Sequence, residues 1–497
     1  MTRGVGLSHF DDFNHWYRVC NIIDLENALP STPDVIYPTY VPGTALWIYL
    51  FTRVTGFGVH AVFLAQMLIH ISCCTALFAL EPRTEDRGTR VLYFALVCVL
   101  SVVLCAMDYT SYCLLVDGTL GLTALAGILM LMTREDRVPL PCLVPLACFL
   151  GIMKTSGLLL AFFLLLYVLL CRPCGRREKL LSAGTLVGLP VILFALYQLY
   201  AGLTFGDAGS SNHAVSVTRW LSVLAERSGS NISDTILNFM SKLFGVQSSI
   251  GQIRVLWFCL LLMTLLAVWR KQRGLRDTGC ARWCRYSFII YFILLLLTYL
   301  FSMSSTEANA RAMACWNRYT GTIAILLGGV TAARCIQLAG ADAGKLRLRL
   351  TAGLAAVILL GAGCFDIGYI WGKDHGDYFA GDAGYNDKGW NITSATVPQQ
   401  TEYNEKVYLV VYREKDFSVG LQWIPVYQTL LRSVHTVFWS LEDVQAGKVP
   451  ADVTANAGSF DYLVTPDDYT HAIDAIRRVV DVPEYTPGIC AISGAAE

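Results

Sequence analysis

Apolar residues occur along this chain in long runs that are separated by short polar connectors. Eight runs are clear, at 58–80, 91–107, 117–133, 180–201, 253–270, 286–304, 320–338 and 349–372. About 20 consecutive apolar residues in a helix cross the hydrocarbon core of a bilayer. Because the polar backbone must be satisfied inside lipid, each run is predicted to be a membrane-spanning helix.

A further apolar stretch, 141–171, is interrupted by Lys154-Thr155-Ser156-Gly157. The interruption predicts two helices, one of them short, that meet at this break. With these two, the chain is predicted to contain about ten spans. The segment 40–57 is also apolar, but a span there would place two basic connectors outside. We interpret it as a helix in the outer membrane interface, anchored by Trp47 and Tyr49.

The distribution of Lys and Arg among the connectors predicts the orientation of the chain. Five connectors, 81–90, 134–137, 171–179, 270–285 and 341–349, together hold 18 basic residues. The opposite connectors, near 108–117, 154–157, 202–252 and 305–319, are longer in total and hold six. Cytoplasmic loops carry the excess of Lys and Arg, so residues 1–39 and the tail from Lys373 are predicted to lie outside the plasma membrane.

Composition and charge agree with this division into compartments. Of 497 residues, 55% are hydrophobic and 15% charged, against about 25% charged in globular domains, which excludes a soluble protein with a single core. The net charge of zero conceals 18 acidic and 9 basic residues from 373 onward, and hence about +9 on the preceding part. Such an asymmetry indicates compartments rather than nucleic-acid binding. The 17 cysteines show no paired CxxC motifs of the zinc type, and we infer no disulfide or metal framework.

Three parts are therefore expected: an extracytoplasmic first loop and interfacial helix (1–57), an α-helical polytopic domain (58–372) and an extracytoplasmic α/β domain (373–497). In the tail, strands are predicted at 406–411, 436–439 and 460–465, and helices at 421–432, from Glu442 and at 467–480. Alternating strands and helices are typical of α/β domains. The tail has no phosphate loop or nucleophile elbow, which favours binding or structural support over catalysis.

A polar N-terminal segment outside the membrane requires something that delivers it there. Either the protein begins at Met1 in this way, or a first transmembrane helix precedes it. We favour the missing helix.

Polar and ionisable residues gather at the outer ends of the predicted spans. Charge near hydrocarbon is costly, so such residues are candidates for function. They are Asp11-Asp12 with His15-Trp16, Tyr37-Pro38 with Pro42, Asp108 and Asp117, Lys154, and Glu307 with Arg311 and Arg318-Tyr319. If these residues lie on one face of the membrane domain, the carboxylates could supply a general base and the Lys and Arg side chains could neutralise a phosphate leaving group.

Each residue also has a simpler interpretation. The pair Asp11-Asp12 suits a base that takes a proton from an acceptor, but acidic pairs in loops are usually solvated, and His15 is either their hydrogen-bonding partner or an exposed loop residue. A lone Lys154 suits a lipid phosphate or simply snorkels. The fork of Arg318 suits phosphate oxygens, yet Arg and Tyr are common at interfaces.

Two acidic candidates also have structural interpretations. Asp117 opens a span, where an acid at a helix N-terminus is favourable in itself. Glu307 is a candidate partner for Arg311 or Arg318 rather than for substrate.

Two motifs nevertheless carry a resemblance: Asp11-Asp12-Phe13-Asn14-His15-Trp16, and Tyr37-Pro38-Thr39-Tyr40-Val41-Pro42-Gly43-Thr44-Ala45-Leu46. They resemble the first external loop of bacterial membrane proteins related to the GT-C glycosyltransferases, which include protein O-mannosyltransferases and the lipid A aminoarabinose transferase. Asp117, Lys154 and Arg318-Tyr319 stand at comparable places. The family motif has Glu where this chain has Asp12 and Ser where it has Asn14.

The resemblance implies an inverting membrane glycosyltransferase that uses a polyprenyl-phosphate-linked sugar. Asp11, with Asp12 second, would be the base, and Lys154 and Arg318 would neutralise the lipid phosphate. His15, Tyr37, Asp117, Glu307 and Tyr319 complete the expected substrate-binding set. The acceptor would be a glycan, lipid or protein of the cell envelope. The sequence identifies no cofactor, and a requirement for a divalent cation stays open.

Two other functions remain as alternatives. A polymerase or ligase of lipid-linked oligosaccharides also needs outer-face Arg and acid residues. A transporter or flippase of lipid-linked sugars would place ionisable residues near the middle of the membrane and show internal repeats. The chain shows no convincing repeat, which favours an enzyme.

Overall fold

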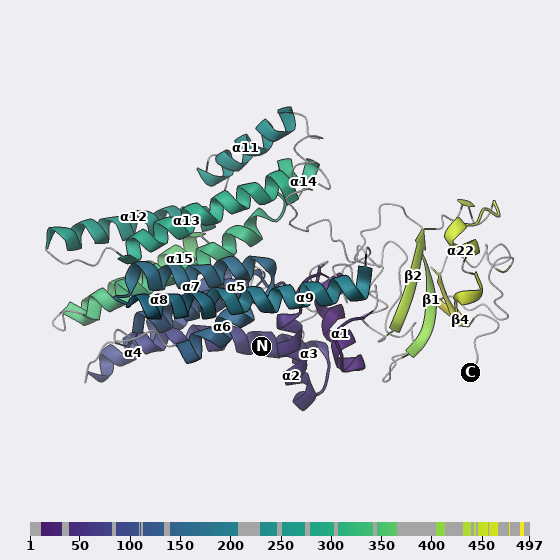
Figure 1. Cartoon of the computed structure of the whole chain (residues 1–497), viewed down its shortest axis with the longest axis horizontal. Helices are drawn as coiled ribbons and strands as arrows, with labels where there is room; N and C mark the ends of the chain where they lie inside the picture. Colours follow the sequence, from purple (N-terminus) through teal and green to yellow (C-terminus); the bar gives the residue numbers. More distant parts are fainter. Residues whose placement is uncertain are drawn as a thin grey trace. The chain divides into compact units, whose positions relative to one another are not determined.

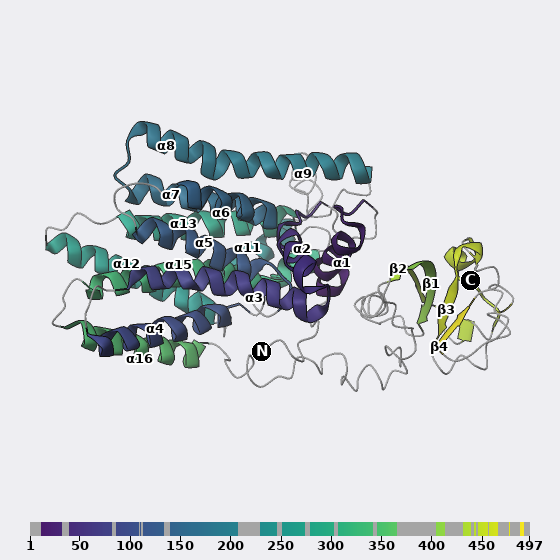
Figure 2. The ribbon, with the colours of Figure 1, turned by 90° about the horizontal axis from the view of Figure 1, so that it is seen from below.

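The computed structural model divides into two compact units, which are described separately: residues 37–51 with 63–373, and residues 1–36, 52–62 and 374–497. Within them the structure describes residues 11–31, 39–81, 86–108, 110, 113–133, 140–206, 229–245, 251–273, 279–302, 307–340, 345–364, 404–412, 431–438, 442–443, 446–455, 457–465, 477 and 488–491. The first unit contains the apolar helices, and Figures 1 and 2 show it from two sides.

Six helices among the described residues are long and apolar enough to cross a membrane. They are α3 with η2 (Val59–Leu80), α4 (Arg87–Ala106), α8 to α9 (Arg176–Phe205), α12 (Gly251–Gln272), α13 with η6 (Gly279–Phe301) and α15 (Trp316–Ala339). Three apolar helices are shorter: α5 (Asp117–Thr133), α6 (Leu140–Met153) and α7 (Thr155–Cys171). The prediction of a multi-pass helical membrane protein is confirmed, and the number of about ten spans stays a prediction.

The helix α5 forms the centre of the helical unit. Almost all of its residues are buried, as expected for a helix that is apolar on every side. It packs against α15, α6 and α7, and Figure 1 shows it inside the bundle. A Cβ added at Gly121 would lie 2.7 Å from the Thr322 carbonyl oxygen, so a glycine there permits the close approach of α5 and α15.

The outer helices present apolar side chains away from the bundle. The rod formed by α8 (Arg176–Ala183), η4 (Gly184–Gly188) and α9 (Leu189–Phe205) lies at the edge of the unit in Figure 2. Leu196, Leu199 and Leu203 are exposed on it. Exposed apolar surface of this extent is typical of contact with lipid rather than water. On another edge, α16 (Leu346–Cys364) packs against α4.

The predicted break in 141–171 is present at Lys154. The helix α6 ends at Met153, α7 begins at Thr155, and Lys154 between them has extended backbone, with φ −166° and ψ 155°. A Cβ on Gly157 would collide with the carbonyl oxygen of Leu150. Because no larger residue fits, the glycine lets the first turn of α7 rest against the end of α6. The two helices and their break are confirmed.

The N-terminal segment is a helix where a loop was expected. A π-helical turn, η1 (Asp12–Trp16), continues into α1 (Tyr17–Glu26), which ends at Asn27 with a positive φ of 54°. Most of α1 is buried, so the aromatic and apolar residues of this segment form a packed face. The predicted interfacial segment contains a helix of 13 residues, α2 (Gly43–Thr55), too short for a span of about 20 residues. Its position in the membrane interface stays a prediction.

The tail contains a four-stranded sheet of order β2-β1-β3-β4. The strand β1 (Asn404–Tyr412) pairs in parallel with β2 (Leu431–Phe438) and with β3 (Tyr462–Thr465), and β4 (Gly488–Ala491) pairs antiparallel with β3. Three predicted strands overlap β1, β2 and β3. Parallel strands require crossover connections, which agrees with the short helix α22 (Ala451–Ala455) between β2 and β3.

Two of the helices predicted in the tail are not confirmed. The helix expected at 421–432 is wrong at Leu431 and Arg432, where β2 begins, because pairing with β1 outweighs the local helical pattern. The remainder of that helix and the helix expected at 467–480, apart from Arg477, lie outside the described residues. The interpretation of 373–497 as an extracytoplasmic α/β domain stays a prediction.

Candidate functional site

Three helix ends in the helical unit bring three predicted site residues together. Asp117 is the first residue of α5, Lys154 lies in the break between α6 and α7, and Arg318 is in the first turn of α15. They are far apart in sequence, and the bundle places them in contact. We call Asp117, Lys154 and Arg318 the acid–base cluster.

One carboxylate holds both cations of the acid–base cluster. The Lys154 Nζ lies 2.7 Å from the Asp117 Oδ1, while the Arg318 Nε donates to Oδ2 over 3.1 Å and a terminal guanidinium nitrogen lies 3.1 Å from the same oxygen. The Asp117 side chain is 2% exposed, that of Arg318 9% and that of Lys154 14%. The simpler interpretation of Lys154 as a snorkelling side chain is therefore wrong, because Lys154 is bonded inside the bundle.

The acid–base cluster retains a net charge of +1, because two cations share one carboxylate. An isolated buried charge is strongly unfavourable, and partners reduce that cost. An ammonium carries three hydrogen-bond donors and a guanidinium five. Such an arrangement is suited to an additional anion.

Tyr319 lies beside the acid–base cluster, as the sequence predicted. The Lys154 Nζ is 5.4 Å from the centre of the Tyr319 ring, a cation–π distance. The Tyr291 hydroxyl of α13 (Gly279–Leu297) donates to the Tyr319 carbonyl over 2.6 Å. The Tyr319 ring therefore packs against the Lys154 ammonium.

Hydrogen bonds that the sequence did not predict fix the helix ends. Thr322 Oγ1 donates to the Asp117 carbonyl over 3.0 Å, which ties α15 to the start of α5. Thr320 Oγ1 donates to Gln252 Oε1 over 3.0 Å, and the Gln252 amide donates to the Met107 carbonyl. Gln252 is buried near the start of α12. A polar side chain at the end of an apolar run is the signal that could have identified it.

Asp108 lies between α4 and α5 and is fully buried. Its Oδ1 accepts the Thr110 N–H over 2.9 Å, and Thr110 Oγ1 accepts the Gly118 N–H over 2.7 Å. Its Oδ2 has no hydrogen-bond partner among the described residues. Burial, and then the negative charge of Asp117, raise the pKa of Asp108 to about 7.

The motif residues Asp11, Asp12 and His15 belong to the other unit. Asp12 and His15 are buried and Asp11 is half-buried, so the interpretations of a solvated acidic pair and an exposed histidine are wrong for Asp12 and His15. Burial lowers the pKa of His15 to about 3, against the opposing charge of Asp11, so the imidazole is neutral at pH 7. It packs edge-on against the Trp16 ring, with centroids 4.7 Å apart.

The side chains of two predicted site residues, Tyr37 and Glu307, are not described by the structure. Tyr37 lies outside the described residues. Glu307 is the first residue of α14 (Glu307–Ala312), but its side chain is not described. Among the described residues, no group of three or more His, Cys, Asp or Glu side chains is placed to hold a metal ion.

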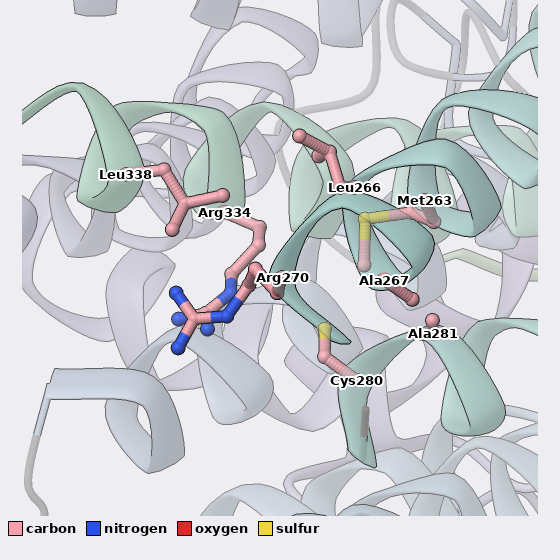
Figure 3. Close-up of a pocket in the computed structure, with 8 residues that line it drawn as sticks. All are labelled: Met263, Leu266, Ala267, Arg270, Cys280, Ala281, Arg334 and Leu338. Atoms are coloured by element: carbon pink, nitrogen blue, oxygen red, sulfur yellow. The ribbon is translucent and has the colours of Figure 1, made fainter. Parts of the chain in front are cut away.

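The helical unit also has a pocket that shares no residue with the acid–base cluster. Figure 3 shows it between α12, α13 and α15, with the guanidiniums of Arg270 and Arg334 on one side. Arg334 lies 16 residues beyond Arg318 on α15, which is roughly 24 Å along a helix at 1.5 Å per residue. The pocket is therefore at the other end of the bundle and is not part of this site.

The substitution Asp117→Asn should destabilise the protein because it leaves two cations near each other without their carboxylate. Breaking a buried ion pair on one side costs about 3–5 kcal/mol, so we expect a clear fall in the thermal midpoint of the purified protein. Glu81→Gln is the matched control, since Glu81 is half exposed and 3.9 Å from Arg90. Equal midpoints for the two variants would contradict the account of the acid–base cluster.

Comparison with known proteins adds a fold relationship. No protein-family model matches the chain, and no curated protein sequence matches it significantly. Two crystal structures of ArnT from Cupriavidus metallidurans, one bound to undecaprenyl phosphate and one in the apo state, are similar, each with a TM-score of 0.52 and 14% sequence identity. The similarity covers 99% of this chain and 96% of the first ArnT chain, and 98% and 94% for the second. ArnT is the lipid A aminoarabinose transferase, a GT-C glycosyltransferase, and this chain has an ArnT-like fold, as its motifs predicted.

Proposed function

We propose that this protein is a membrane glycosyltransferase of GT-C type. It transfers a sugar from a polyprenyl-phosphate-linked donor to a glycan, lipid or protein of the cell envelope, on the extracytoplasmic face of the plasma membrane. The acid–base cluster carries this proposal, because Asp117 holds Lys154 and Arg318 together with a net positive charge. The ArnT-like fold supports it, since one ArnT structure contains undecaprenyl phosphate.

The charge of the acid–base cluster suits the chemistry of a phosphate leaving group. When the bond between the anomeric carbon and the phosphate oxygen breaks, the sugar carbon passes to the acceptor oxygen and the phosphate gains a negative charge. Cations that are already positioned stabilise this developing charge without reorganising at the moment of reaction. Arg318 offers a planar fork to two phosphate oxygens, and Lys154 acts as a compact charge beside it.

The acceptor requires a base, which we assign to Asp11, with Asp12 second. A carboxylate can accept the proton of the acceptor hydroxyl or amine as the new glycosidic bond forms. His15, Tyr37, Asp117, Glu307 and Tyr319 are proposed to bind the substrates. The burial of Asp12 and the neutral His15 support a structured acceptor segment rather than a solvated loop.

The proposed topology places the acid–base cluster, residues 1–57 and the domain 373–497 on the extracytoplasmic side, with 58–372 as the membrane domain. The basic connectors support this orientation. In a transporter, ionisable residues would lie near the middle of the bilayer. Asp117 opens α5 and Arg318 is in the first turn of α15, which favours an enzyme with a site at the membrane surface. A polymerase or ligase of lipid-linked oligosaccharides remains the alternative enzyme.

Lys154→Gln should lower the rate of sugar transfer from an undecaprenyl-phosphate sugar to membrane lipid acceptors. A hydrogen bond to a charged group contributes about 1.5–3 kcal/mol, so we expect a fall of about tenfold to a hundredfold in kcat/KM for the donor. Lys271→Gln is the matched control, because Lys271 is exposed in the last turn of α12. An unchanged rate for Lys154→Gln would show that the acid–base cluster does not bind the donor.

The double substitution Asp11→Asn and Asp12→Asn should abolish sugar transfer while donor binding remains. The amides keep the size of the side chains but cannot accept a proton at neutral pH. Radiolabelled sugar in the acceptor lipid measures transfer, and retention of undecaprenyl phosphate by the purified protein measures binding. Transfer at the wild-type rate in the double variant would eliminate both residues as the base.

A further inference from the structure

The buried carboxylate of Asp108 packs against α15 within one turn of Arg318, the member of the acid–base cluster on that helix. A Cβ added at Gly321 would be 2.5 Å from the Asp108 Oδ2, so the carboxylate rests directly against the backbone of α15. Arg318 is three residues earlier and Thr322, which bonds to the Asp117 carbonyl, is the next residue. Asp108 and Asp117 therefore contact the same turn of α15.

The charged and titratable groups that act on Asp108 come from three helices. Asp117 of α5 opposes its ionisation and Arg318 of α15 favours it. The Tyr291 hydroxyl of α13 lies within electrostatic range of both carboxylates. The neighbouring side chain at the start of α12 is the uncharged Gln252, which bonds to the preceding residue, Met107. The Asp117 carboxylate and the Arg318 guanidinium of the acid–base cluster therefore act on Asp108 in opposite directions.

We propose that Asp108 takes up a proton when the anionic phosphate of the donor binds at Asp117, Lys154 and Arg318, and releases it when the anion leaves. This inference rests on the proposed function of the acid–base cluster. It makes Asp108 a positioning residue that adjusts the charge of the site, with no contact to the reacting atoms required.

The charges explain why the proton should follow the anion. With Asp108 ionised, the charges of the two carboxylates and the two cations sum to zero. A bound phosphodiester anion changes the net charge of the site to −1. A proton on Asp108 then returns the net charge to zero. In a buried site with a low effective dielectric constant, such an imbalance is costly. The unpartnered Oδ2 supplies the position for the proton.

The pKa of Asp108, raised to about 7, places this exchange in the physiological range. At pH 7.5 the carboxylate is mostly ionised before the anion binds, so binding takes up a proton. At pH 5.5 it is already protonated, and binding takes up none. By linkage, the affinity for the anion should fall by up to about tenfold per pH unit above pH 7 and be constant below pH 6.

Isothermal titration calorimetry of the full-length protein in detergent tests the inference. The probe is farnesyl methyl phosphate, a phosphodiester whose own charge does not change between pH 5 and 9. Titrations in HEPES and in Tris at pH 7.5 differ in apparent enthalpy in proportion to the protons taken up. We expect an uptake of between half a proton and one proton per anion at pH 7.5, and none at pH 5.5 in a matched pair of buffers.

Asp108→Asn should bind the probe without proton uptake and with an affinity that does not vary with pH. Asp86→Asn is the matched control, because Asp86 caps the opposite end of α4 through the Gly88 and Thr89 N–H groups, and Asn caps equally well. It should retain the wild-type uptake. If Asp108→Asn fails to fold, the loss of uptake between pH 7.5 and 5.5 in the wild type still tests the inference.

The outcomes separate this inference from the proposed function. Binding without proton uptake in the wild type, or uptake that persists in Asp108→Asn, would overturn the role of Asp108 and leave the donor site intact. No binding of the probe at either pH would overturn the donor site, and the role of Asp108 with it.

Discussion

The Asp117 carboxylate, held between Lys154 and Arg318, is the interaction on which the rest of the helical unit depends. Removing three charges from water is costly, and only close, well-oriented pairing offsets that cost. The pairing in turn requires that α5 begins at Asp117, that the chain is extended at Lys154 and that α15 begins just before Arg318. The glycines at 121 and 157 make this possible, because they allow the helices to approach closely.

The pairing of Asp117 with both Lys154 and Arg318 also makes the acid–base cluster suitable for binding an anion. One carboxylate positions two cations without neutralising both, so Asp117, Lys154 and Arg318 by themselves carry a charge of +1, which an ionised Asp108 balances until an anion binds and Asp108 takes up a proton. Asp108 adds a second carboxylate, which packs against α15 at Gly321 and has one oxygen unpartnered among the described residues. A structural ion pair would need neither the surplus charge nor a second buried acid. The surplus is the physical basis of the proposed donor site.

Much of the helical unit could be predicted from the sequence, because runs of apolar residues identify the helices without knowledge of their contacts. The break at Lys154 follows from a polar interruption in an apolar run, and the topology predicted that Asp117, Lys154 and Arg318 share a face. Local patterns could not predict the contacts that depend on distant partners. The helical N-terminal segment with buried Asp12, the start of β2 at Leu431 and the bonds of Gln252 are set by tertiary packing.

The most direct test of the account is a cryo-electron microscopy structure of the protein in lipid nanodiscs with undecaprenyl phosphate. We expect density for the phosphate within hydrogen-bond distance of the Lys154 ammonium and the Arg318 guanidinium, with Asp117 still bonded to both. Phosphate density elsewhere, for example between Arg270 and Arg334, with the acid–base cluster unoccupied, would contradict it.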